Sequence, residues 1–292
     1  MKRIAFIFLC LLLSGCNAKE EAKNFAEMVS ISKNAVIKAE EDRNVFVGAD
    51  ISEDVNVKSI GEFEDKCGKH QVYADEFLFS ETEKIEKFIL ECYSQDRIPY
   101  IVLKYDNNAE NRHFEKQLSE LAEVFNRYKV QFMVEIFFNG YYDKNGEKYD
   151  FITERLKNPN AVFVGSVEKG NAVFTDILAE NADIVCVNGY FENAGDVEKT
   201  FNALKNTDKK IILRYGAKYF SSSDCTYRAH DMEEAVKCVY NGTAENENIV
   251  GVIYMDKNRR TADRAVYADY SITSEEKIRK LYRELVRKTA DL

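Results

Sequence analysis

From Val45 onward, the chain alternates short apolar segments with longer amphipathic ones. The short segments are rich in β-branched and aromatic residues, and in several of them apolar side chains recur at every second position, which is typical of β-strands. The pattern predicts eight strands, at Val45–Asp50, Gln71–Asp75, Tyr100–Tyr105, Gln131–Phe138, Ala161–Gly165, Ile184–Asn188, Lys210–Tyr215 and Val250–Met255.

Helical periodicity fills the intervals between these strands. The clearest predicted helices are Glu81–Tyr93, Glu110–Tyr128, Asp196–Lys205, Asp231–Tyr240 and a last one from Ser274, as N-cap, to about Lys288. Alternating strands and helices imply a parallel sheet, because parallel neighbours need crossover connections. Eight repeats predict a single (β/α)8 TIM barrel over residues 45–292. An open doubly wound sheet is the alternative, although the sequence has neither G-x-G-x-x-G after the first strand nor a P-loop.

The first residues have the features of an export signal. Lys2 and Arg3 precede the apolar run Ile4–Leu13, which is too short to span a bilayer as a permanent helix. Leu13-Ser14-Gly15-Cys16 matches the bacterial lipobox, in which the cysteine accepts a diacylglyceryl group and becomes the new N-terminus. We therefore expect a signal peptide at 1–15, a membrane tether and N-terminal helix at 16–44, and an extracytoplasmic protein anchored to the cell membrane by lipidated Cys16. An ordinary secretory signal is the alternative.

Composition narrows the choice of partners. The formal net charge of the 292 residues is −9, and an acidic balance argues against nucleic acid as the main partner. Five cysteines follow Cys16, without any C-x-x-C spacing, so a zinc site is not supported and no metal or cofactor is expected. Cys186 fits a small core residue, whereas pairing of Cys67 with Cys92, or of Cys225 with Cys238, stays open. The three histidines, His70, His113 and His230, lie away from the predicted strand ends.

Polar and aromatic side chains gather at the carboxyl ends of the predicted strands. In a TIM barrel these ends share one rim, which carries the active site of barrel enzymes. Tyrosine faces stack on sugar rings, while carboxylate, amide and guanidinium groups bond to sugar hydroxyls. The ligand-binding candidates are Asp50, Asp75, Lys104, Asp106, Glu135, Asn139, Tyr141, Asn188, Tyr190, Arg214, Tyr254 and Asp256.

A family resemblance arises from the segment that follows the fourth strand. Asn139-Gly140-Tyr141-Tyr142 resembles the strand-four signature of family 26 glycoside hydrolases, the β-mannanase type of barrel. Further pieces resemble other strands of that family in the same order, at Val45–Ala49, Arg97–Val102, Asn160–Val164, Ala182–Tyr190 and Lys209–Ala217. The resemblance spans about Val45 to Asp256 and implies a glycoside-hydrolase-like TIM barrel.

The departures from that family bear on activity. Where the family has its general acid/base glutamate, this sequence has Phe137, and where the family has its nucleophile it has Arg214. A retaining glycosidase needs two carboxyl groups roughly 5–5.5 Å apart, and neither replacement supplies one. Glu135 lies two residues before Phe137 and so faces the same side of the strand. It pairs with Arg214 in one interpretation and acts as a relocated catalytic acid in the other.

Two functional hypotheses follow. The first is a non-catalytic lipoprotein, a pseudoenzyme whose barrel rim binds a glycan or a cell-surface partner. The alternative is an active glycoside hydrolase on a β-linked polysaccharide that uses non-standard carboxylates, with Glu135, Asp106 and Asp256 as candidates.

Overall fold

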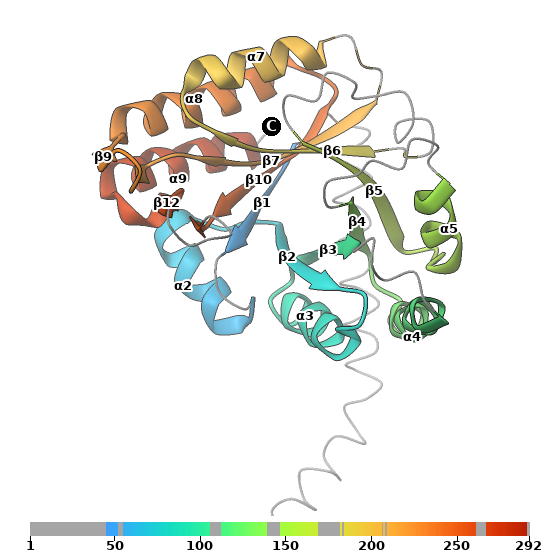
Figure 1. Cartoon of the computed structure of the whole chain (residues 1–292). Helices are drawn as coiled ribbons and strands as arrows, with labels where there is room; N and C mark the ends of the chain where they lie inside the picture. The colour runs from blue at the N-terminus through green and yellow to red at the C-terminus, as the bar shows by residue number, and fades with distance from the viewer. Residues whose placement is uncertain are drawn as a thin grey trace, which may run out of the picture.

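The computed structural model describes residues 45–51, 55–105, 112–138, 147–168, 182, 184–205, 207, 209–260 and 267–290 (Figure 1). The expected signal peptide, the tether and Cys16 lie outside the described residues. Of the ligand-binding candidates, Asp106, Asn139 and Tyr141 also lie outside them.

Eight strands form a closed barrel in which all neighbouring strands are parallel (Figure 1). Around the barrel they follow the order β1-β10-β7-β6-β5-β4-β3-β2. The strands are β1 (Phe46–Ile51), β2 (Val72–Leu78), β3 (Ile98–Tyr105), β4 (Phe132–Phe138), β5 (Ala161–Glu168), β6 (Ile184–Phe191), β7 (Lys210–Ala217) and β10 (Ile249–Asp256). The predicted TIM barrel is confirmed, and closure excludes the open doubly wound sheet.

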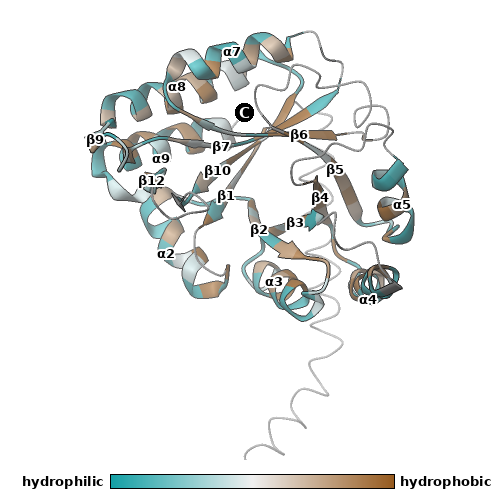
Figure 2. Ribbon diagram, in the orientation of Figure 1, coloured by the Kyte–Doolittle hydropathy of each residue, from teal (hydrophilic) through white to brown (hydrophobic). Residues whose placement is uncertain are grey.

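Helices surround the barrel and turn their apolar faces toward the strands (Figures 1 and 2). They are α2 (Val57–Cys67), α3 (Thr82–Ser94), α4 (Arg112–Arg127), α5 (Glu147–Arg155), α7 (Ala194–Leu204), α8 (Ala229–Glu245) and α9 (Glu276–Ala290). Within the described residues, no helix is long and apolar enough to cross a membrane.

The predicted start of the last helix is wrong. Ser274 is not the N-cap of α9, which begins at Glu276; it ends a short 3₁₀ turn, η2 (Ile272–Ser274). Its hydroxyl donates to Asp269 Oδ2 at 3.1 Å instead of capping the helix.

The core has an inner layer inside the barrel and an outer layer between strands and helices. Ile184 and Cys186 belong to the inner layer, as the sequence predicts. Phe46 also lies there, and a Cβ on Gly251 would come within 2.1 Å of its ring, so glycine is required at that crossing. None of the five cysteines in the described residues forms a disulfide.

The segments that follow β7 and β10 form a small antiparallel sheet, which we call the rim sheet. Its strands are β8 (Phe220–Ser221), β9 (Thr226–Tyr227), β11 (Asn258–Arg260) and β12 (Tyr267–Asp269), in the order β11-β12-β8-β9. Figure 1 shows β9 and β12 beside α8 and α9. The sequence pattern did not predict this sheet.

Candidate functional site

Charged and polar side chains from several strands meet inside the C-terminal half of the barrel. Asn188 on β6 and Arg214 on β7 are direct neighbours in register, so both side chains enter the lumen at the same level. Asp50, Glu76 and Glu135 reach the same group of atoms from β1, β2 and β4. The parallel register therefore brings together four candidates, Asp50, Glu135, Asn188 and Arg214, and adds Glu76.

Arg214 is the centre of this group. Its side chain is 3% exposed, and its Nε donates to Asn188 Oδ1 at 2.5 Å. Its Nη1 lies 3.2 Å from Asp50 Oδ2 and 3.5 Å from Glu76 Oε1. Its Nη2 lies 3.7 Å from Glu135 Oε1, which confirms the expected pairing of Glu135 with Arg214. Most of the guanidinium is thus committed to partners within the protein.

Glu135 is fully buried and both of its carboxylate oxygens accept hydrogen bonds. Tyr100 donates its hydroxyl to Oε2 at 2.8 Å. Ser166 Oγ and Asn188 Nδ2 donate to Oε1, at 2.6 and 2.7 Å. Sequence reasoning missed Tyr100 and Ser166 as partners, although both occupy inward-facing positions on their strands.

Two lysines complete the network. Lys257 Nζ lies 2.6 Å from Asp50 Oδ1 and 3.4 Å from Glu76 Oε1. Lys104, a candidate from the sequence, forms an ion pair with Glu76 Oε2 at the solvent side. Lys257 was missed because it follows the last residue of β10. Within the described part of the lumen, three carboxyl groups therefore face three basic side chains.

The pKa values follow from burial and from this pairing. Burial raises the pKa of Asp50, against the lowering effect of Lys257 and Arg214. Burial also acts to raise the pKa of Glu76, but Lys257, Arg214 and Lys104 outweigh it and hold that pKa at about 2. The pKa of Arg214 lies well above its ordinary value: burial opposes the charge, and Glu135 and Asp50 overcome that cost. At neutral pH the Glu76 carboxylate is therefore ionised and the Arg214 guanidinium is protonated.

Three candidates lie outside the lumen, contrary to expectation. Tyr254 is buried against the helices, and its hydroxyl donates to the Tyr270 carbonyl at 2.7 Å. Asp256 caps the η2 turn by accepting from the Ile272 N–H at 2.6 Å and from Thr273 Oγ1 at 3.2 Å.

Asp75 is the third of these candidates, and it alternates with the inward residues Ala74 and Glu76 of β2. Its Oδ1 accepts from the Glu76 N–H at 2.8 Å. Burial raises the pKa values of Asp75 and Asp256 to about 6 each, without bringing either group to the lumen.

Aromatic side chains border the lumen network toward the rim. Tyr190 is half-buried and its ring lies 4.3 Å from that of Tyr270. A Cβ on Gly216 would come within 2.9 Å of the Tyr190 ring, so glycine lets this ring lie across β7. Phe137 is half-buried and packs against the inner core layer. The arrangement places apolar faces beside fixed charges.

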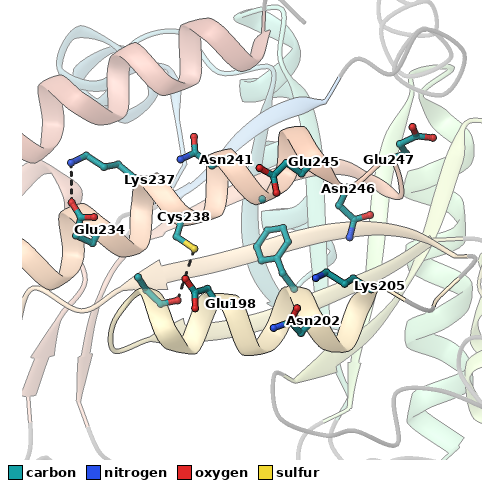
Figure 3. Close-up of a pocket in the computed structure, with 13 residues that line it drawn as sticks. Glu198, Asn202, Lys205, Glu234, Lys237, Cys238, Asn241, Glu245, Asn246 and Glu247 are labelled. Atoms are coloured by element: carbon teal, nitrogen blue, oxygen red, sulfur yellow. Dashed lines mark hydrogen bonds and ion pairs between the residues drawn. The ribbon is translucent and has the colours of Figure 1, made fainter.

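A cleft of about 720 Å³ lies elsewhere, between α7 and α8 on the outside of the barrel (Figure 3). None of the ligand-binding candidates lines it. Lys237, one of its lining residues, is already bonded to Glu233 and Glu234 at 2.9 Å each. Among the described residues, no group of three or more His, Cys, Asp or Glu side chains is arranged to hold a metal ion.

Comparison with known proteins supports the architecture. No family model and no curated protein matches the sequence. Among solved structures, the β-D-glucuronidase of Dictyoglomus thermophilum matches with a TM-score of 0.60 and 14% identity, over 84% of this chain and 50% of that one. A β-glucuronidase from Ruminococcus gnavus in complex with D-glucaro-d-lactam matches with a TM-score of 0.62 and 9% identity, over 82% and 49% of the two chains. The chain spans about half the length of these enzymes, and at such identities the similarity concerns the fold: a TIM barrel like that of glycoside hydrolases.

Proposed function

We propose that this protein is a membrane-anchored extracytoplasmic lipoprotein whose glycoside-hydrolase-like barrel binds a glycan at its C-terminal rim without hydrolysing it. The observation that carries the proposal is the fixed position of Arg214. This cation is buried among Asp50, Glu76, Glu135 and Asn188, at the position where family 26 enzymes are expected to have their nucleophile.

The chemistry of glycoside cleavage explains why this arrangement argues against catalysis. The reaction passes through an oxocarbenium-like transition state and needs a proton donor together with a nearby negative charge. Phe137 has no proton to donate. Arg214 stays protonated and presents a positive charge to a developing cation, which raises the energy of the transition state.

A relocated active site has little support from the described residues. Glu135, one of the carboxylates around Arg214, is fully buried, and its oxygens are bonded to Tyr100, Ser166 and Asn188. Asp256, another alternative acid, is engaged in capping a turn outside the lumen. Asp106 lies outside the described residues.

Glycan binding is supported by what remains accessible. Lys104 is 44% exposed and Glu76 is 27% exposed at the solvent side of the network, and both can bond to hydroxyl groups. Tyr190, on β6 at the other side of the barrel, supplies a half-buried aromatic face. A few convergent polar groups beside an apolar surface are typical of small-ligand and sugar sites.

The test of this function is incubation of the wild-type protein with mannans, glucans and xylans. We expect no release of reducing ends, together with binding that Tyr190→Ala weakens. Turnover of about 1 s⁻¹ or faster that disappears in Glu135→Gln would overturn the proposal and establish the active hydrolase in its place.

Membrane anchoring is tested separately, since it rests on the Leu13-Ser14-Gly15-Cys16 motif. A Cys16→Ser chain should lose lipid-dependent processing and leave the membrane fraction, because no thiol remains to carry the diacylglyceryl group. Unchanged processing and membrane attachment of Cys16→Ser would exclude the lipid anchor.

A further inference from the structure

Basic side chains gather at one corner of the barrel, where α9 passes the end of α2. Lys66 lies in the last turn of α2 and Lys69 follows it, while Arg283, Arg287 and Lys288 lie in the C-terminal half of α9. All five side chains are exposed. We call these five residues the basic corner.

Contacts between α2 and α9 bring the basic corner together. Arg283 Nη2 donates to the carbonyl of Lys66 at 2.8 Å and also to that of Asp65. A Cβ on Gly68 would lie 3.4 Å from Arg283 Cγ, so the end of α2 lies against α9. Arg287 follows Arg283 by one helical turn and shares its face. The two helices therefore present these cations side by side.

Nearby carboxylates leave the basic corner with an excess of positive charge. Asp65 and Glu284 are exposed on the same two helices, and among the described residues neither forms an ion pair with the five cations. Glu64 on α2 is already paired with Arg97. Arg283 bonds to neutral carbonyls, which leave its charge uncompensated. Five cations thus outnumber two carboxylates here, although the formal net charge of the whole chain is −9.

The acidic side chains of the neighbouring helix α8 lie elsewhere. Glu233 pairs with Lys277 near the start of α9, at 2.6 Å. Glu245 and Glu247, at and just after the other end of α8, line the cleft between α7 and α8 (Figure 3). The positive charge at the C-terminal end of α9 therefore faces solvent.

The basic corner lies at the pole of the barrel where the chain enters it. All eight barrel strands are parallel, so they begin at one pole and end at the rim on the other. β1 begins directly after Val45, α9 packs against β1, and Lys69 lies three residues before β2. The segment 16–44, which we expect to be the tether, therefore joins the barrel at the pole that carries the basic corner.

We propose that the basic corner rests on anionic lipid headgroups and turns the rim of the barrel away from the membrane. This inference rests on the proposed lipid anchor and adds an orientation to it. Lys and Arg side chains are attracted to a bilayer that contains anionic lipid, over about a Debye length. An anchor raises the local concentration of the chain at the membrane, so a weak contact is enough to select one orientation. The barrel mouth then faces outward, where a glycan can reach it.

The experiment uses the full chain with Cys16→Ser, which has no thiol at residue 16 to carry a lipid. It measures affinity for vesicles of phosphatidylcholine and for vesicles of an equal mixture of phosphatidylcholine and phosphatidylglycerol. The readout is the ratio of the second affinity to the first, in which the apolar run Ile4–Leu13 contributes equally to both terms. Arg287→Gln with Lys288→Gln should lower this ratio by about tenfold or more, because two attractions to the anionic surface are lost.

Lys277→Gln with Lys280→Gln is the matched control. This variant removes two cations from the same helix and changes the net charge equally. However, Lys277 is paired with Glu233 and Lys280 with Glu276, at the rim end of α9. The control should leave the ratio nearly unchanged, and thermal midpoints establish that both double variants fold. An equal loss in both would overturn the inference, because overall charge would then govern binding.

A second measurement reports the orientation on the mixed vesicles. A fluorophore on Cys225, which is exposed beside β9 of the rim sheet, should escape a quencher carried by the lipid headgroups. A fluorophore on Glu284→Cys, in a chain with Cys225→Ser, should be quenched. The reverse result would overturn the proposed orientation.

Failure of this inference is distinguishable from failure of the lipid anchor, which is read from the processing of Cys16. A lipidated chain whose affinity ratio does not depend on Arg287 and Lys288 would overturn the inference and keep the anchor. Binding through the basic corner by a chain that is never lipidated would overturn the anchor and support the basic corner as a lipid-binding surface.

Discussion

Arg214 is the residue around which the polar interior of the barrel is arranged. Bringing a guanidinium out of water costs several kcal/mol, and the attraction to partners offsets this cost only when they are close and well oriented. Here Asp50, Glu135 and Asn188 are within contact of a single side chain, and Lys257 balances the remaining charge on Asp50. A buried network of this kind adds little net stability over an apolar core of the same volume, but the loss of one member leaves the others buried without compensation.

Removing the Arg214 guanidinium should therefore lower the stability of the folded protein. Arg214→Met removes the cation beside the buried Glu135 and leaves Asp50 with Lys257, and we expect the free energy of unfolding to fall by about 3–5 kcal/mol. Urea denaturation at pH 7 measures the change. Arg228→Met is the control, because Arg228 pairs with Asp224 at the surface, where ion pairs contribute little. Equal stability of wild-type and Arg214→Met proteins would contradict the role assigned to the network.

Strand periodicity predicted part of this site and misplaced the rest. Simple alternation along β4 and β7 predicts that Glu135 and Phe137 face the same side of their strand and that Arg214 faces the lumen. On β10 alternation fails, because the register shifts between Ile249 and Gly251. Both Val250 and Ile253, three residues apart, face the inner core layer. This irregularity turns Tyr254 and Asp256 outward and brings Lys257 into the lumen. Strict alternation along the sequence, counted from Val250, predicts the opposite.

The length of a strand decided whether it could be predicted from the sequence. The eight barrel strands were all located, since each is a run of apolar residues long enough to show a pattern. β2, β5, β6 and β7 end later than expected, and β3 begins at Ile98, before the expected Tyr100. The strands of the rim sheet have two or three residues each, which is too short for any periodicity. The strands of the rim sheet form because β7 and β10 are neighbours in the barrel, so the segments that follow them lie side by side.

Two glycines test how the elements pack. Gly61 lies within α2 with open space around its Cα, so Gly61→Ala should stabilise the protein by about 0.5–1 kcal/mol through lower entropy of the unfolded chain. Gly251→Ala should destabilise it by about 1–3 kcal/mol, because the new methyl group collides with Phe46. Denaturant midpoints of the two variants should move in opposite directions. A Gly251→Ala protein as stable as wild type would show that Phe46 can rearrange freely.

For the whole molecule, His70 links the early and late parts of the chain. It lies between α2 and β2, is fully buried, and its Nε2 accepts from the Tyr282 hydroxyl of α9 at 2.8 Å while its Nδ1 donates to the Gly68 carbonyl. The His70 and Tyr282 rings also stack, with 5.7 Å between centroids. Burial lowers the pKa of His70 to about 4.

This shifted pKa makes stability depend on pH. Below pH 6.5 His70 takes up a proton in the unfolded chain, whereas in the folded protein it stays neutral down to about pH 4. The free energy of unfolding therefore falls by about 3 kcal/mol as the pH drops through this window. Asp75 and Asp256 act in the opposite sense, because pKa values raised to about 6 favour the folded state as these carboxyls take up protons below that pH.

Comparison with His70→Gln isolates the histidine from these carboxyls. The difference in unfolding free energy between wild type and variant should shrink as pH falls from 6.5 to 4, measured by urea titration at each pH. A difference that stays constant over this window would refute the assignment of a neutral, buried His70.

Closure of the barrel leaves no free strand edge inside it. Among the described strands, only β9 and β11, at the two ends of the rim sheet, have a side without a neighbour. Exposed edges are the templates on which proteins add foreign strands and aggregate. Edges of two and three residues are too short to start such growth. A chain confined by a lipid to a crowded membrane surface, as we propose, would thereby stay free of edge-to-edge polymerisation at high local concentration.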